Sequence, residues 1–246
     1  MMRLKEKTLE AIFTAFAAWQ SRQELACARG CSTCCSQQVE ITALEGDMIM
    51  AHVREEQGQG WLAGLLEQER ETSAAPPTHN GYAQAYLAGE ELADDERHTP
   101  LLLAPCPFLL AADSSCAIYP ARPMACRVMG STTRCKAEES ATMTPAMIAG
   151  GGVALQIVEH LGQGEYWGNM LDVLLALGDQ QENGKMAQAL AEPNIMNHAR
   201  ARLRPALPVP GFIIADEERG EVEQLMGAIF ATEVEGRKVE DILNGR

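Results

Sequence analysis

The sequence predicts a mainly α-helical protein whose helices are joined by irregular loops rich in cysteine and proline. Three observations predict this fold class. Apolar residues recur at helical spacing over much of the chain, few stretches read as strands, and all eight cysteines fall into two groups within the first 140 residues. The chain of 246 residues can bury a large core without disulfides. We expect two domains, residues 1–140 with the cysteines and residues 141–246 as a helical C-terminal extension packed on it.

The first cysteine group is expected in a loop between two helices. Leu9, Phe13 and their apolar neighbours share one helix face, which predicts a helix over about residues 4–24. Thr42 followed by Glu45 forms a capping box, the signature of a helix start. The helical pattern then continues to about residue 72, with glycines near residue 58 as a break.

The middle of the chain changes character twice. Residues 73–81 have the composition of a linker, and a short helix is expected over Tyr82–Asp94. Residues 99–135 combine cysteines and prolines with short apolar runs. Because proline blocks a continuous helix, we expect this segment to be irregular and to need an outside constraint.

The C-terminal part reads as helical. Thr144 and Pro145 mark a helix start, although the glycines at 150–152 would each weaken that helix by about 1 kcal/mol relative to alanine. Further helices are expected over residues 166–177, 185–191 and 222–230, with an extended proline-rich connection over residues 205–210.

Composition restricts the class of partner and the compartment. The formal net charge is −14, from 34 acidic and 20 basic residues, which argues against nucleic acid or an anionic membrane surface as a partner. The N-terminus shows no signal peptide, and no apolar run is long enough to span a membrane. We therefore expect a cytoplasmic protein, in which clustered cysteines are reduced and favour metal ligation over disulfides. An exported protein with disulfides is the alternative.

The cysteines form the one chemical specialisation of the chain. They are Cys27, Cys31, Cys34, Cys35, Cys106, Cys116, Cys126 and Cys135, and all eight are candidate metal ligands. Ligand sulfurs of a tetrahedral zinc site lie about 2.3 Å from the metal, so cysteines close in sequence reach one ion only where the backbone curls. Gly30 and Ser32 permit such a curl.

Two of the eight cysteines raise separate questions. Cys34 and Cys35 are adjacent, so on an extended backbone their side chains point to opposite sides. They serve either two metals or one metal with a spare thiol. Cys135, distant from the others and without a turn motif, is either a ligand or a buried thiol.

A metal would explain both the crowding of thiols and the irregular segment. Four thiolates without a cation repel one another, whereas a divalent ion or cluster iron neutralises them. Structural zinc contributes about 10–16 kcal/mol, comparable with the whole stability of a domain at about 5–15 kcal/mol. We therefore expect the loops of residues 1–140 to be organised around a metal site.

The residues that carry this pattern resemble a known family. CARGCSTCC, residues 27–35, and CPFLLAADSSCAIYPARPMACR, residues 106–127, are similar to the cysteine-cluster family named for its CxxCxxCC motif. The chain departs from the motif in that three residues, not two, separate Cys27 from Cys31. The resemblance covers about residues 25–135 and leaves the C-terminal 110 residues outside. It implies chelation of zinc or iron and no established reaction.

Spacing does not separate zinc from an iron–sulfur cluster, since both take four thiolates. The thiol count and the adjacent cysteines favour iron in a cluster slightly, and zinc stays open. The leading hypothesis is a metal-binding protein with no assigned protein partner. The alternative is a redox or transferase enzyme that uses a cysteine-ligated cluster.

Four neighbouring side chains have two readings each. Arg122 and Arg127 flank Cys126 and either balance thiolate charge or make structural contacts. Tyr119 either packs with its hydroxyl satisfied or contacts a ligand sulfur or iron. His52 lies on the helix that follows the first cysteines, and a non-ligand histidine is the favoured reading there.

Overall fold

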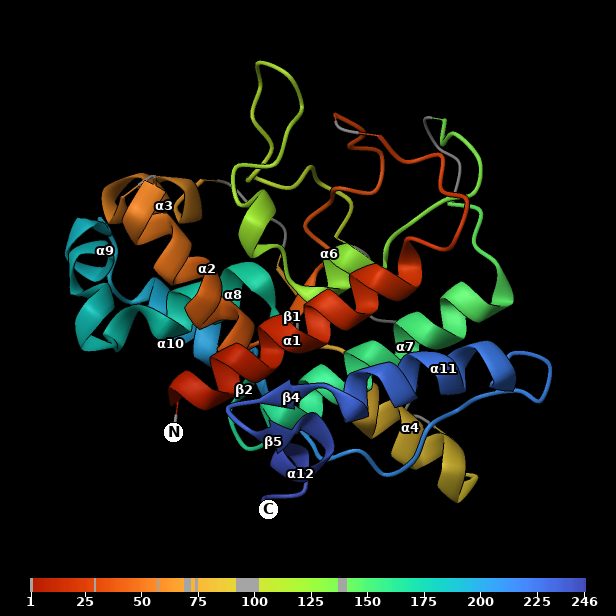
Figure 1. The fold of residues 1–246 in the computed structure, drawn as a ribbon. Coiled ribbons are helices and arrows are strands. Elements are labelled where there is room, and N and C mark those ends of the chain that lie inside the picture. The colour runs from red at the N-terminus through yellow and green to blue at the C-terminus, as the bar shows by residue number, and fades with distance from the viewer. Residues whose placement is uncertain are drawn as a thin grey trace.

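The computed structural model has a mainly helical architecture with few short strands (Figure 1). About half of the chain is helical, which confirms the predicted fold class at this level. Irregular loops gather along one side of the molecule, above the helices in this view. The structure describes residues 2–28, 30–56, 58–68, 72–73, 75–91, 102–136 and 141–246.

The first three helices follow the sequence pattern. Helix α1 spans Met2–Gln20, helix α2 spans Ala43–Glu56 and helix α3 spans Gln59–Leu66. The predicted capping box is present at the start of α2. Glu45 Oε2 accepts from the backbone N–H of Thr42 at 2.9 Å, and Thr42 Oγ1 accepts from the N–H of Glu45 at 3.2 Å. Gly58, at φ 82°, separates α2 from α3, so the predicted break is confirmed.

Helix α4 starts earlier than predicted. It spans His79–Ala88, because the side chain of Thr78 caps it by accepting from the N–H of Gly81 at 2.9 Å. The expected linker is therefore shorter. Helix α4 ends at Gly89, whose φ of 68° is the left-handed conformation typical of a helix end. The predicted end at Asp94 lies outside the described residues.

The strongest difference from the sequence prediction is a small antiparallel sheet. Strands β1 (Glu40–Thr42), β2 (Tyr166–Asn169) and β3 (Arg204–Pro205) pair in that order. Tyr166, expected in a helix, lies in β2, because the hydrogen bonds of β1 and β3 extend this segment. The helix begins only at Met170, where Asn169 Oδ1 accepts from the N–H of Leu171 at 3.1 Å.

The remaining elements include the helices expected in the C-terminal part of the chain and several elements that the sequence did not predict. They are η1 (Tyr119–Ala121), α6 (Met124–Val128), α7 (Pro145–Leu161), α8 (Met170–Ala176), η2 (Leu177–Asp179), η3 (Gln181–Asn183), α9 (Gly184–Ala189), α10 (Ile195–Arg200), α11 (Arg219–Ala231), β4 (Glu233–Val234), β5 (Arg237–Lys238) and α12 (Val239–Leu243). Between residues 102 and 136 the chain has no regular element longer than α6, as the prolines predict for this described part.

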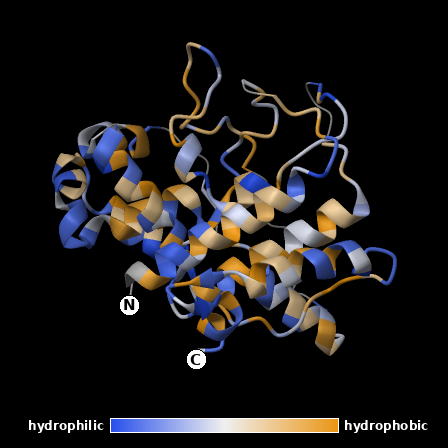
Figure 2. Ribbon diagram, in the orientation of Figure 1, coloured by the Kyte–Doolittle hydropathy of each residue, from blue (hydrophilic) through white to orange (hydrophobic). Residues whose placement is uncertain are grey.

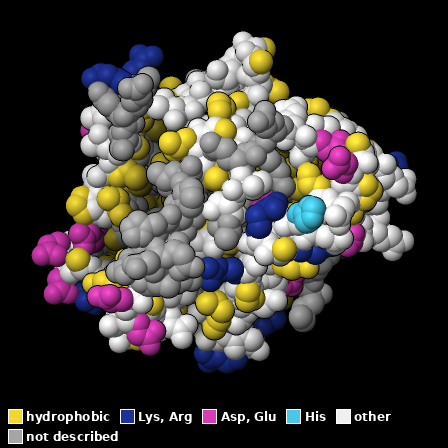
Figure 3. Space-filling model, turned by 180° about the vertical axis from the view of Figure 1, so that it is seen from behind, with side chains coloured by type: hydrophobic (Ala, Val, Ile, Leu, Met, Phe, Trp, Pro, Cys, Tyr) yellow, Lys and Arg dark blue, Asp and Glu magenta, His cyan; other side chains and the backbone are white. Residues whose placement is uncertain are grey.

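The surface is mixed in character. Blue and orange residues alternate along α1 and α11, as expected of amphipathic helices (Figure 2). On the face turned away from Figure 1, hydrophobic side chains form scattered patches among charged ones (Figure 3). None of the described helices has the length and apolar character needed to cross a bilayer.

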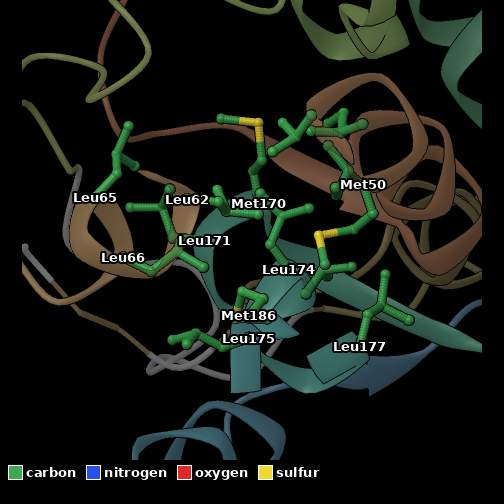
Figure 4. Packing of buried hydrophobic residues seen from close by; sticks show 14 of the residues in the cluster. Met50, Leu62, Leu65, Leu66, Met170, Leu171, Leu174, Leu175, Leu177 and Met186 are labelled. Carbon is green, nitrogen blue, oxygen red and sulfur yellow. The ribbon is translucent and has the colours of Figure 1, made fainter. Parts of the chain in front are cut away.

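Two large clusters of buried side chains make up most of the core in the described residues. The first joins α2, α3, α8, α9 and α10, and Figure 4 shows Met50 and Leu62 packed toward Leu171 and Leu174. The second joins α1, α7, α11 and α12. Each cluster includes residues from both sides of residue 140, so the two parts of the chain share both cores.

Buried polar groups hold α4 on α7. Glu159 is 1 % exposed, and its carboxylate accepts from the backbone N–H groups of Asn80 and Leu207, both at 2.8 Å. Asn80 Nδ2 in turn donates to the carbonyls of Gln156 and Leu207. These hydrogen bonds pair the free N–H groups in the first turn of α4 and hold the segment after β3 in place. Without them, these polar groups would be buried unpaired, at a cost in free energy.

Helix α7 runs without a break through its three glycines. A Cβ at Gly150 would lie 2.6 Å from the ring of Trp19, and a Cβ at Gly151 would lie 3.2 Å from Cβ of Val128. A Cβ at Gly152 would meet no atom within 4 Å. Two of the glycines therefore permit close packing of α1 and α6 on α7, and the third serves no such contact.

Gly150 and Gly152 offer a matched pair of variants. We expect Gly152→Ala to raise the free energy of unfolding by about 1 kcal/mol through helix propensity alone. Gly150→Ala gains the same propensity but forces the Trp19 ring to move, at a cost of about 1–3 kcal/mol, and should lower the free energy of unfolding. Urea unfolding followed by circular dichroism measures both. Equal effects of the two variants would contradict the close contact of Trp19.

Candidate metal centre

Three cysteine-bearing loops are joined by backbone hydrogen bonds on one side of the molecule (Figure 1). The N–H of Cys106 donates to the carbonyl of Cys35 at 3.0 Å, and the N–H of Gln37 donates to the carbonyl of Ala104 at 2.8 Å. The N–H of Ala26 donates to the carbonyl of Ser131 at 2.8 Å. The first cysteine group is therefore attached both to the segment of Cys106 and to the loop that precedes α7.

Cys106 and Cys116 occupy two turns of the same design. In each turn the thiol accepts from the backbone N–H two residues later, that of Phe108 or Ile118. The carbonyl of each cysteine accepts from the N–H three residues later, at 3.1 Å in the first turn and 3.2 Å in the second. Hydrogen bonds of this kind favour the thiolate form that binds metals.

The core fixes the position of both turns. Phe108 and Ile118 are 1 % and 2 % exposed and belong to the first core cluster. The turns are also linked to each other. The N–H of Ala117 donates to the carbonyl of Phe108 at 2.8 Å, and the backbones of Leu109 and Cys116 form an isolated antiparallel β-bridge. The two thiols are thus held relative to each other by buried side chains and backbone pairing.

Cys126 lies on the short helix α6, which a buried carboxylate holds in place. Glu45 is 3 % exposed, and its Oε1 accepts from the N–H of Met124, the first residue of α6, at 2.7 Å. Its other oxygen closes the capping box of α2 through Thr42. Burial raises the pKa of Glu45, and the hydrogen bonds from Thr42 and Met124 oppose that shift. The capping box was predictable, but the second acceptor role joins residues 79 positions apart.

The two arginines near Cys126 have different roles. Arg127 donates from Nε to the carbonyl of Arg122 at 2.7 Å and from Nη2 to the carbonyl of Pro120 at 3.0 Å. Its guanidinium also lies 4.3 Å from the ring centroid of Phe13. Arg127 therefore makes structural contacts that close the loop between η1 and α6.

Arg122 faces the thiols instead. Its positive charge lowers the pKa of Cys34, Cys116 and Cys126, although burial outweighs this effect in the latter two. The guanidinium lies 3.8 Å from the ring centroid of Tyr119. That ring is 56 % exposed, so Tyr119 covers the arginine and is not a packed core residue.

Four thiols lie close enough to influence one another's protonation. Burial, followed by the charges of Cys106 and Cys116, raises the pKa of Cys126 to about 12. Burial and the charge of Cys116 raise the pKa of Cys106 to about 11. The pKa of Cys35 is raised chiefly by its hydrogen bond to Cys34, then by burial and by the charges of neighbouring thiols that include Cys106 and Cys126. Near neutral pH these four side chains are therefore neutral thiols.

Cys34 behaves differently from its neighbour. The thiol of Cys35 donates a hydrogen bond to the sulfur of Cys34, which lowers the pKa of Cys34 to about 6, with help from Arg122. Cys34 is also exposed, so a thiolate is accessible at the rim of the group. The adjacent pair thus divides into one thiolate and one thiol.

The other candidate ligands lie outside this group. Cys27 and Cys31 are exposed and Cys135 is half-buried, and no hydrogen bond among the described residues joins any of them to another thiol. All eight cysteines are free in the structure. Within the described part of the chain, no set of three or more cysteine, histidine, aspartate or glutamate side chains is arranged so that it could hold a metal ion.

The residues nevertheless fit a thiolate-bound metal by their chemistry. Cys35, Cys106, Cys116 and Cys126 supply soft donors from three segments, two with N–H···S turns, beside the cationic Arg122. Such donors suit zinc and iron–sulfur clusters.

The described histidines make contacts elsewhere. His52 lines a groove of about 430 Å³ together with Asp47, Pro120 and other residues of α1, α2 and η3. Burial lowers the pKa of His79 to about 4, and its ring meets Trp167 edge-on at 5.5 Å. His160 accepts at Nδ1 from the N–H of Val209 at 3.0 Å. His98 lies outside the described residues.

Fold and site together define a helical protein with cysteine-rich loops, in which some thiols from separate segments are near enough to affect one another's pKa. Residues 26–146 match the sequence model of the family described as "CxxCxxCC: Putative zinc- or iron-chelating domain". The match confirms the resemblance and extends it by 11 residues beyond residue 135, into the first residues of α7. Comparison with curated proteins and with solved structures found no match.

The division between Cys34 and Cys35 can be tested by alkylation of the reduced, metal-free protein. At pH 7.5 we expect iodoacetamide to modify Cys34 faster than Cys31, which is also exposed but has no hydrogen bond to another thiol among the described residues. Cys35→Ala should slow the reaction at Cys34, whereas Cys35→Ser retains a donor and should slow it less. Peptide mapping by mass spectrometry follows each site. Unchanged reactivity in Cys35→Ala would contradict the hydrogen bond as the cause.

Proposed function

We propose that this chain is a metal-binding protein that holds zinc or iron, the latter as an iron–sulfur cluster, through Cys35, Cys106, Cys116 and Cys126. One observation carries the proposal: these four thiols share one neighbourhood although the chain supplies them from three separate segments. The family match supports chelation of zinc or iron. Cys27, Cys31, Cys34 and Cys135 stay predicted ligands, of the same metal or of a second one.

The bound metal would supply positive charge and covalent cross-links to the loops. Its ligands would come from the loop before β1, from the paired turns of Cys106 and Cys116, and from α6. These segments have little regular structure of their own. A metal cross-link between them would therefore hold them in one conformation.

The cellular setting that we propose follows from the thiols and the charge. Reduced cysteines are stable in the cytoplasm, and the net charge of −14 favours a metal ion or cluster over nucleic acid or an anionic membrane as the partner. No protein partner is assigned.

A redox or transferase enzyme is the second candidate function, and the groove beside Pro120 and Ala121 favours it. These two residues belong to η1, which follows Cys116, so the groove of about 430 Å³ shares a wall with the cysteine segment. Ligand pockets commonly have volumes of about 300–1,000 Å³. The groove would therefore have room for a substrate near the metal.

Metal content of the anaerobically purified protein tests the proposal. We expect close to one zinc ion or one iron–sulfur cluster per chain at the four-thiol group, detected as zinc, or as iron and sulfide with absorption near 400 nm. Cys106→Ser should lose most of that metal, because it removes a ligand held by the core. Arg219→Gln, a change at an exposed ion pair on α11 outside the cysteine loops, serves as the control and should retain it. A wild-type protein without metal after reconstitution would refute the proposal.

The raised thiol pKa values predict a pH dependence of metal binding. Cys106 and Cys126, with pKa values of about 11 and about 12, are protonated at pH 7, so coordination must release their protons. Apparent affinity for Zn²⁺ should therefore rise with pH, by about tenfold per unit for each proton released, and fall in acid. Calorimetry in buffers of different ionisation enthalpy counts the protons. Equal affinity at pH 6.5 and pH 8 would contradict coordination by these thiols.

A further inference from the structure

Arg122 occupies a fixed position between two candidate ligands. It lies in the turn between η1 and α6, six residues after Cys116 and four before Cys126. Its carbonyl accepts from Nε of Arg127 at 2.7 Å, and its guanidinium lies over the ring of Tyr119. The backbone and the guanidinium plane of Arg122 are therefore both held in place by contacts within the protein.

The side chain carries a donor that the described residues do not use. Nε of Arg122 is buried and has no hydrogen-bond partner among them. An arginine remains charged at any pH that the protein meets, so this N–H cannot lose its proton to relieve the burial. A buried charged donor without an acceptor is unfavourable, and such a group persists where a ligand completes it.

The charges around Arg122 show which ligand would suit it. Its charge acts on the thiols of Cys34, Cys116 and Cys126, so anionic sulfur would be its natural acceptor. The neighbouring Arg127 carries the same charge and so repels Arg122. Arg122 takes part in none of the ion pairs found among the described residues.

We propose that Arg122 is the residue that balances the charge of the metal–thiolate centre and that its Nε donates to a ligand sulfur once metal is bound. This inference rests on the proposed function. A zinc ion or cluster with four thiolates carries net negative charge, which a guanidinium beside it offsets. A hydrogen bond to a ligand sulfur also lowers the energy of the sulfur lone pairs and so alters the electronic spectrum of the metal–sulfur bond.

Arginine suits this role better than lysine. The guanidinium is planar, stacks on Tyr119 and presents Nε at a fixed position on the chain. A lysine would keep the charge but would place a mobile ammonium group there. Arg122→Lys therefore separates the effect of charge from that of the Nε hydrogen bond, and Arg122→Gln removes both.

The experiment is a Co²⁺ titration of the reduced protein, with the sulfur-to-cobalt charge-transfer band as the readout. We expect Arg122→Gln to weaken Co²⁺ binding by about 10- to 100-fold and to shift the band to longer wavelength. Arg122→Lys should retain most of the affinity but show the shift. The control is Arg219→Gln, which removes one exposed charge paired with Asp216 and should change neither quantity.

The metal-free proteins distinguish this role from a structural one. Because Nε has no hydrogen-bond partner among the described residues, the urea midpoint of metal-free Arg122→Gln should stay close to that of the wild type. A large loss of stability in the metal-free variant would mean that Arg122 supports the fold, and would overturn the inference. An Arg122→Gln protein with wild-type affinity and spectrum would overturn it as well, while leaving the proposed function intact. Wild-type protein that takes up no Co²⁺ would refute both.

Discussion

The buried carboxylate of Glu45 is the contact on which the arrangement of the cysteine loops depends. One oxygen completes the start of α2 through Thr42, and the other accepts from the first N–H of α6. A carboxylate with 3 % exposure is unfavourable unless its lone pairs are used, and here three hydrogen bonds use them. Since α6 carries Cys126 and α2 follows the first cysteine group, this side chain ties two thiol-bearing segments to one point.

The raised pKa values keep the thiols of Cys106, Cys116 and Cys126 neutral near pH 7. Burial raises the pKa values of Cys106, Cys116 and Cys126, and the charges of neighbouring thiols add to the shift at Cys106 and Cys126, so crowding costs little while these sulfurs keep their protons. The N–H donors of Phe108 and Ile118 are already aimed at two of the sulfurs and favour the thiolate form. Such an environment opposes ionisation without metal, and a divalent ion bound as proposed would outweigh the cost of desolvation.

Helices of the C-terminal half of the chain pack against the cysteine-bearing segment. Helix α7 lies against α1 and α6, and its glycines at 150 and 151 let Trp19 and Val128 approach closely. Helix α8 supplies much of the first core cluster, which includes Phe108 and Ile118 beneath the cysteine turns. The segment outside the matched family therefore contributes directly to the rigidity of the segment inside it.

The sequence alone determined the helical class, the cysteine loops and the resemblance to the cysteine-cluster family, because helix faces, caps and thiol spacing are local patterns. It predicted the capping box of Thr42 and Glu45, the break at Gly58 and the start of α7 at Pro145. Only the tertiary structure decided which thiols lie together and how Arg122 and Arg127 differ. It also decided that Tyr166 lies in a strand. Each of these depends on partners far away along the chain, such as the carbonyls that hold Arg127 or the strands that flank β2, and spacing in sequence does not encode such contacts.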